Sequence, residues 1–190
     1  MAPRDVALWV NGINYDLTET VLRYGGVPVK YVGDGFLAFF AETDHPKRAL
    51  SAALKARELA RNPDIVIALH SGEIYLGTVG HPDYARPDII GETVNAVFFA
   101  MAWIAAHCET GIGLTQTVAE AVSDHIRLTR REQITDVVGL HLQAGLIARV
   151  TGSELHVAHS PSVEEALVHA VCRRVHPGHV RYRREVEVAP

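Results

Sequence analysis

The chain has 190 residues, a net charge of -4, 48% hydrophobic residues and 21% charged residues. This balance is typical of one soluble globular domain with a full-sized core, and it excludes an intrinsically disordered chain. The mild acidity, with no run rich in Lys and Arg before residues 181–184, argues against a nucleic-acid-binding protein.

Membrane and secretion signals are also missing from the pattern. The longest apolar run, residues 96–106, is shorter than the roughly 20 residues that cross a bilayer, and the N-terminus does not resemble a signal peptide. The two cysteines, Cys108 and Cys172, form no CxxC pair, so we expect buried free thiols in a reducing compartment. These features predict a cytoplasmic protein that binds neither membrane nor nucleic acid.

The first half of the chain alternates between helix and strand signals. Residues 16–24 carry apolar side chains at helical spacing, and Gly25-Gly26 is typical of a helix end. Two β-rich runs then flank Gly33-Asp34-Gly35, which predicts a hairpin. The elements expected up to residue 80 are a helix at 16–24, strands at 27–32 and 36–40, a helix at 46–61, and strands at 64–70 and 74–79.

A loop over residues 81–87 precedes a helix at 93–108, which is apolar nearly all round and is expected to be deeply buried. A strand at 112–115, a helix at 116–123, and strands at 126–128 and 144–150 follow. This order predicts an α+β domain over residues 1–150, with a mainly antiparallel sheet and helices packed on it. Residues 151–190 read as a C-terminal extension of unknown role, with a helix at 163–175 and a strand at 180–188.

Four motifs in this order carry a family resemblance. Asp34 in its glycine-flanked turn is by itself an ordinary turn former. However, residues 25–40 resemble the GG…K.(I/V)GDG…AxF signature of class III adenylyl and guanylyl cyclases. Three further stretches are similar to motifs of the same family, at residues 10–21, 67–80 and 88–95. The resemblance spans about residues 8–150 and implies a ferredoxin-like, βαββαβ-derived cyclase homology domain.

The resemblance also implies a mechanism. In this family two domains pair head to tail, and two Mg²⁺ or Mn²⁺ ions held by two aspartates promote attack of the ribose 3′-oxygen on the α-phosphorus, releasing pyrophosphate. Asp34 matches the second metal-binding aspartate, and Asn95 matches the catalytic asparagine that orients the ribose. Lys30 and Asp88 match the two residues that read the purine.

The nature of that purine-reading pair favours ATP. A lysine can donate to a ring nitrogen of adenine while a carboxylate accepts from its exocyclic amine, whereas guanylyl cyclases resemble this pattern with Glu and Cys instead. The resemblance therefore implies formation of cyclic AMP. Each residue also has a structural interpretation: Lys30 as a surface residue of an edge strand, Asp88 as a polar strand start, and Asn95 as a cap of a helix turn.

Two departures from the family pattern weaken the catalytic interpretation. The strand with the motif F.DI.GFT and the first metal-binding aspartate does not occur in the 33 residues before Asp34, which indicates a truncated gene, a misplaced start or degeneration. In addition, Phe99 occupies the position of the arginine that stabilises the transition state. Losing one such donor costs about 10²–10³ in rate.

Three functions stay open at this point. The chain is an adenylyl cyclase domain with impaired activity, a non-catalytic pseudo-cyclase that senses nucleotides or dimerises, or the purine-binding half of a heterodimer whose partner supplies the metal site.

Overall fold

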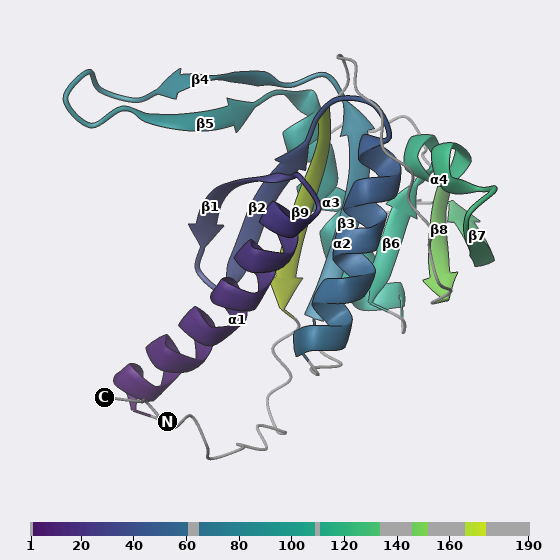
Figure 1. Ribbon diagram of the computed structural model, residues 1–190, viewed down its shortest axis with the longest axis horizontal. Coiled ribbons are helices and arrows are strands. Elements are labelled where there is room, and N and C mark those ends of the chain that lie inside the picture. Colours follow the sequence, from purple (N-terminus) through teal and green to yellow (C-terminus); the bar gives the residue numbers. More distant parts are fainter. Residues whose placement is uncertain (1, 61–64, 109–110, 134–145, 152–165, 174–190) are drawn as a thin grey trace.

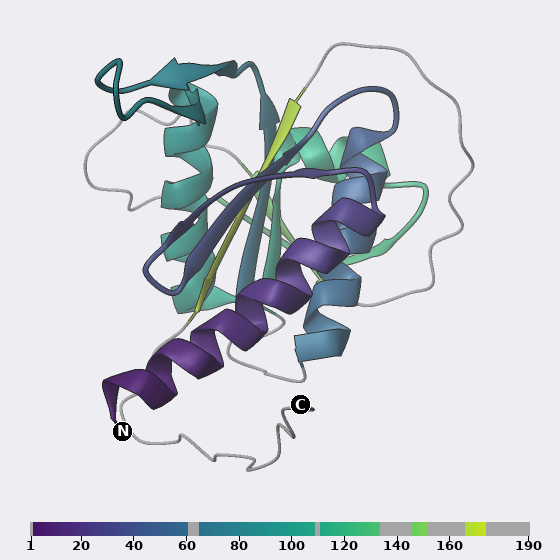
Figure 2. The ribbon, with the colours of Figure 1, turned by 60° about the vertical axis from the view of Figure 1, so that its left-hand side comes forward.

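The computed structural model describes residues 2–60, 65–108, 111–133, 146–151 and 166–173 (Figures 1 and 2). Its helices are α1 (Pro3–Arg23), α2 (His45–Ala60), α3 (Glu92–His107) and α4 (Gln116–Val122). Its strands are β1 (Val27–Val32), β2 (Gly35–Phe40), β3 (Ile65–Gly72), β4 (Tyr75–Val79), β5 (Arg86–Ile90), β6 (Ile112–Thr115), β7 (Arg127–Gln133), β8 (Leu146–Thr151) and β9 (Ala166–Arg173).

Seven strands form the main sheet, in the order β1-β2-β9-β3-β6-β8-β7. Only β3 and β6 run parallel, and every other neighbouring pair in this sheet is antiparallel. The predicted α+β class with a mainly antiparallel sheet is therefore confirmed. Within the described residues, no helix is long and apolar enough to cross a membrane.

Helices cover both faces of this sheet (Figure 2). One core cluster joins α1, α2 and α4 to the sheet through side chains such as Leu50, Ile67 and Val118. A second cluster joins α3 to the opposite face, around Leu37 and Val97. Strand β2 is apolar throughout and β3 is apolar from Ile65 to Leu69, without polar alternation, which fits strands that are buried on both faces.

The junction between α1 and β1 is confirmed as a glycine helix end. The N–H of Gly26 donates to the carbonyl of Val21 and the N–H of Gly25 donates to that of Leu22, which is a Schellman motif with Gly25 at φ 73°. A Cβ atom on Gly26 would come within 2.6 Å of the Phe40 ring. Helix α1 begins at Pro3, well before the predicted start, because proline is favoured in the first turn of a helix.

The predicted hairpin is confirmed with a two-residue loop. Val32 pairs with Gly35, so Gly33 and Asp34 form the loop, and Gly33 adopts φ 62°. Glycine at the first central position suits a type II′ turn, whose twist matches that of the flanking strands. The turn therefore fixes Asp34 at the start of the buried strand β2.

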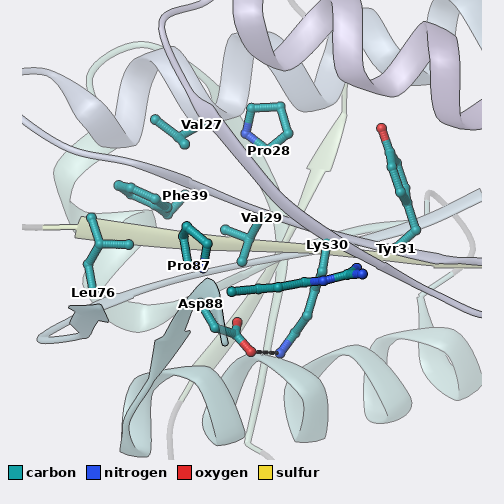
Figure 3. A pocket seen from close by; sticks show the side chains of 10 residues that line it. Val27, Pro28, Val29, Lys30, Tyr31, Phe39, Leu76, Pro87 and Asp88 are labelled. Carbon is teal, nitrogen blue, oxygen red and sulfur yellow. Dashed lines mark hydrogen bonds and ion pairs between the residues drawn. The ribbon is translucent and has the colours of Figure 1, made fainter. Parts of the chain in front are cut away.

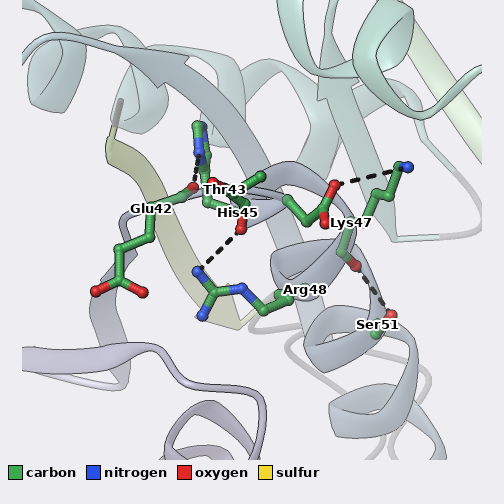
Figure 4. A network of polar contacts seen from close by, with 7 residues as sticks. Glu42, Thr43, His45, Lys47, Arg48 and Ser51 are labelled. Atoms are coloured by element: carbon green, nitrogen blue, oxygen red, sulfur yellow. Dashed lines mark hydrogen bonds and ion pairs between the residues drawn. The ribbon is translucent and has the colours of Figure 1, made fainter. Parts of the chain in front are cut away.

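Arg48 of α2 ties the C-terminal end of α1 to the end of β2. Its guanidinium donates to the carbonyl of Gly25 at 3.0 Å, to that of Thr43 at 3.5 Å and to that of Ala41. Figure 4 shows this side chain beside the loop after β2, where His45 also bonds the Glu42 carbonyl through Nδ1 at 2.8 Å. The guanidinium of Arg48 thus holds the end of α1 and the end of β2 next to each other.

The loop expected over residues 81–87 is partly wrong. Residues 86–90 form β5, which pairs with β4 in a separate two-stranded ribbon that projects from the main sheet (Figure 1). Pro87 and Asp88 both disfavour strands, so local propensity hid this element. The ribbon has no third strand to bond it in the described structure, which is where proline is tolerated.

Helix α3 is less buried than its sequence predicts. Its sheet-facing side is buried, but Phe98, Phe99 and Trp103 are half-buried and Ala102 is exposed. The apolar composition on all sides therefore does not correspond to burial on all sides, and an outer apolar surface of α3 stays accessible.

The helix predicted over residues 163–175 is wrong. Residues 166–173 form β9, which lies between β2 and β3 in the main sheet. A short apolar run cannot be assigned to helix or strand by periodicity alone, and here pairing with a strand on each side decides the outcome. The strand predicted at 180–188 lies outside the described residues.

Candidate functional site

Lys30 of β1 and Asp88 of β5 meet although 58 residues separate them. The Lys30 ammonium lies 2.6 Å from Oδ2 of Asp88, while Oδ1 accepts a 2.8 Å hydrogen bond from the backbone N–H of Ile89. The ion pair links the edge of the main sheet to the projecting ribbon. The two residues matched to purine recognition are therefore adjacent in space, and their roles stay predictions.

A pocket of about 650 Å³ surrounds this ion pair (Figure 3). Its walls are mostly apolar side chains from β1, β2 and the ribbon, with a few polar groups. The lining residues are Val27, Pro28, Val29, Lys30, Tyr31, Phe39, Leu76, Arg86, Pro87 and Asp88. An apolar pocket of this size with a few convergent polar groups is typical of a small-molecule site, and its walls suit a flat aromatic base.

The ion pair has capacity left for a ligand. The side chains of Lys30 and Asp88 keep 39% and 22% of their surface exposed. A pair that faces solvent contributes only about 0.2–1 kcal/mol to stability. An ammonium has three donors, of which Asp88 takes one, so two stay free for a bound molecule.

Asn95 lies in the first turn of α3, which begins directly after Gly91, a residue with φ 143°. Its side chain is exposed and makes no hydrogen bond with the described part of the chain. The helix start is fixed by the neighbouring motif, because Thr93 Oγ1 donates to the Glu73 carbonyl at 2.6 Å and a Cβ on Gly72 would meet Thr93 at 2.6 Å. Two sequence motifs twenty residues apart thus determine where Asn95 stands.

Asp34 stands apart from this pocket. It does not line the pocket, and its carboxylate has no hydrogen bond or ion pair within residues 2–60, 65–108 and 111–128. Two divalent ions that share an attacking and a leaving oxygen lie about 3.5–4 Å apart and need more than one carboxylate. Within the described residues, no three His, Cys, Asp or Glu side chains are grouped so that they could hold a metal ion. The described residues around Asp34 therefore do not fit a two-ion site.

Phe99 lies one helical turn after Asn95 and is half-buried. An aromatic ring supplies no hydrogen-bond donor to a phosphate. The departure from the family pattern noted in the sequence is thus also a departure in chemistry, on the exposed side of α3.

Sequence reasoning missed Arg86. It lies two residues before Asp88 on β5, lines the same pocket and makes no hydrogen bond or ion pair with the described residues. Residues at alternate positions of a strand share a face. The spacing would have linked Arg86 to Asp88 if residues 86–90 had been recognised as a strand.

His70 follows the apolar part of β3 and is partly buried. Burial lowers the pKa of its imidazole, and Nδ1 lies 2.9 Å from Thr115 Oγ1. A neutral ring at pH 7 follows. It joins β3 to β6 next to the motif that holds the start of α3.

The fold alone defines the class to which the structure belongs. The fold is that of the catalytic domain of class III adenylyl and guanylyl cyclases. The guanylyl cyclase Cya2 superposes with a TM-score of 0.65 at 19% identity, covering 86% of this chain and 88% of that one. The adenylyl cyclase CyaB from P. aeruginosa gives a TM-score of 0.63 at 21% identity, covering 81% and 86%.

A third similar structure is the non-canonical dimeric guanylyl cyclase domain of the RhoGC fusion protein from the aquatic fungus Blastocladiella emersonii. It has a TM-score of 0.60 at 17% identity and covers 82% of this chain and 86% of that one. No protein-family model matches the sequence, and no curated protein matches it. The similarity therefore lies in the fold, and both nucleotide specificities occur among the neighbours.

Proposed function

We propose that this chain is a class III adenylyl cyclase-type domain that binds ATP through Lys30 and Asp88 and works in cyclic-nucleotide signalling in the cytoplasm. The observation that carries the proposal is the 2.6 Å ion pair of these residues at the wall of the 650 Å³ pocket. It joins a donor and an acceptor at the position where the resemblance expects the base.

Adenine suits this pair better than guanine. Lys30 donates to the ring nitrogen N1, and Asp88 accepts from the exocyclic amine. Guanine reverses both groups, because its N1 carries a hydrogen and its O6 is an acceptor. Each unsatisfied or opposed polar group costs about 1–3 kcal/mol, so GTP should bind at least tenfold more weakly.

The surface of the ribbon supports pairing with a second cyclase domain, head to tail. Five large apolar side chains of β4, β5 and their connection are exposed: Tyr75 at 59%, Leu76 at 56%, Val79 at 39%, Tyr84 at 84% and Ile90 at 46%. Exposed apolar patches often mark protein–protein contacts. A second domain, either another copy or a different cyclase chain, is the partner we propose.

Phe99 favours a second candidate function, in which the domain has no catalytic activity. A half-buried aromatic ring in place of an arginine suits packing and not phosphate chemistry. The second candidate is a non-catalytic pseudo-cyclase that binds nucleotide or only dimerises. In either case, any Mg²⁺ or Mn²⁺ pair requires a carboxylate that the described residues do not place beside Asp34.

Calorimetry and a product assay separate these candidates. Titration with ATP and GTP should show at least tenfold tighter binding of ATP, and the double change Lys30→Glu with Asp88→Cys should reverse the preference. Formation of cyclic AMP from ATP with Mn²⁺ would establish the enzyme, while ATP binding without product supports the sensor. Absence of any nucleotide binding overturns the proposal.

A further inference from the structure

Strand β9 occupies the centre of the main sheet. It runs antiparallel to β2, with Phe36 opposite Val171 and Phe40 opposite Leu167, and antiparallel to β3, from Ile65 opposite Arg173 to Gly72 opposite Ala166. Figures 1 and 2 show it between these two strands in both views. No direct pairing joins β2 to β3, so β9 alone connects the hairpin to the rest of the sheet.

This central position must be filled for the domain to hold together. Every residue of β2 is buried, and β3 is buried from Ile65 to Leu69. An empty position would leave two buried strand edges with unpaired N–H and C=O groups, each costing about as much as a lost hydrogen bond. Any other strand that enters the sheet here has to displace β9.

The same position is where a second metal-binding carboxylate would have to lie. Asp34 directly precedes β2, and β2 has two neighbours, β1 and β9. Strand β1 leads directly into Asp34 through the hairpin and carries no Asp or Glu. Ions about 4 Å apart demand that the second carboxylate be next to the first, so the strand on the other side of β2 is its natural source.

We propose that β9 has taken the place of the metal-bearing strand, so that the sheet is complete but the two-ion site is not. Strand β9 contains no Asp or Glu. The β2–β9 register ends at Phe36 opposite Val171, and its continuation by two residues brings Arg173 level with Asp34. On this continuation, a basic residue falls at the register position where two cations would need an anion. This inference rests on the cyclase-type domain proposed above, but not on nucleotide binding by Lys30 and Asp88.

A cross-link tests the position of β9. Val66 lies opposite the native Cys172, and opposed residues of antiparallel strands are about 4.5–5.5 Å apart, within the Cα range of a disulfide. We expect Val66→Cys in the full chain to form a disulfide with Cys172 on mild oxidation, detected by peptide mapping. The matched control Ala68→Cys, which faces Ala170, should not form it. Equal or absent cross-linking in both variants overturns the proposed position.

Mn²⁺ binding, followed by electron paramagnetic resonance, tests the consequence. The wild-type chain should bind Mn²⁺ no better than Asp34→Asn does. Arg173→Asp supplies the carboxylate opposite Asp34 and should tighten Mn²⁺ binding at least tenfold, and the gain should vanish when Asp34→Asn is added. Arg4→Asp, at an exposed residue of α1, controls for the change in net charge. Wild-type binding that depends on Asp34, or no gain in Arg173→Asp, overturns the inference.

Discussion

Two regions of the β1–β2 hairpin differ in how many interacting groups surround them: the pocket at Lys30 and the loop at Asp34. At the ribbon side, Lys30 and Asp88 form an ion pair within an apolar pocket, although they come from distant parts of the chain. At the loop side, Asp34 has no described partner, and β9, the far neighbour of β2, carries no carboxylate. The structure therefore builds a pocket around Lys30 and Asp88 but, within the described residues, places no metal-binding group around Asp34.

The two regions also differ in what they contribute to the stability of the fold. The ion pair contributes little to stability, because both side chains keep contact with solvent. Strand β9, in contrast, has a structural role inside the sheet, where it pairs with both β2 and β3. It fills this position without a carboxylate, so the fold does not require a metal-binding residue there.

The largest effect is expected from breaking β9 itself. Proline at Ala170, which lies opposite both Leu37 and Ala68, removes a donor from a central strand and should lower the free energy of unfolding by about 3 kcal/mol or more. Chemical denaturation followed by circular dichroism measures this loss. Thr129→Pro, at the irregularity of the edge strand β7, should cost much less. Equal losses would show that β9 is not central.

The next largest effect should come from Arg48, which serves both regions equally. Its guanidinium bonds the chain just before β1 and just after β2. Hydrogen bonds to a charged group are worth about 1.5–3 kcal/mol, so Arg48→Ala should lower the free energy of unfolding by about 2–3 kcal/mol. Lys47→Ala, which removes only a 3.7 Å contact to Asp44, should change it by less than about 1 kcal/mol. The ratio of ATP to GTP affinity should stay constant in both variants.

Measuring nucleotide affinity distinguishes the Lys30–Asp88 pocket from the Asp34 loop. Lys30→Ala removes the donor to the base and leaves the Asp88 carboxylate without its cation, so ATP should bind about 10–100-fold more weakly by calorimetry. Asp34→Ala should leave ATP affinity unchanged within about twofold when EDTA is present. An equal loss in both variants would mean that the two regions form one site within a single chain.

The sequence predicted the hairpin that carries Lys30 well, because the signals for its helix end and turn are local. The Gly25-Gly26 helix end, the Gly33-Asp34 turn and the spacing of the strands each follow from backbone chemistry within a few residues. The resemblance then placed Lys30 and Asp88 in one site, and the structure brings them together. Arg86 was missed because Pro87 and Asp88 hid the strand on which it lies.

Strand β9 was not predictable in the same way. Residues 166–173 have apolar positions compatible with a helix, and nothing local indicates pairing with strands about 100 and 130 residues earlier. Only the need of β2 and β3 for a partner determines their conformation, and that need is a property of the whole sheet. The burial of α3 was overestimated for a related reason, since composition does not reveal which side of a helix has a neighbour.

The smallest expected effect concerns His70, whose imidazole joins β3 to β6 through Thr115 and lies outside both regions. Burial lowers the pKa of its imidazole from the ordinary value of 6.5, so below pH 6.5 the unfolded chain binds a proton that the folded chain does not. The stability that His70 contributes is therefore present above pH 6.5 and is lost as the pH falls toward the lowered folded value. The slope for one proton is at most about 1.4 kcal/mol per pH unit. Urea unfolding between pH 7.5 and 5.5 should show a shallower decline of the unfolding free energy in His70→Asn than in the wild type, and equal slopes would contradict this role of His70.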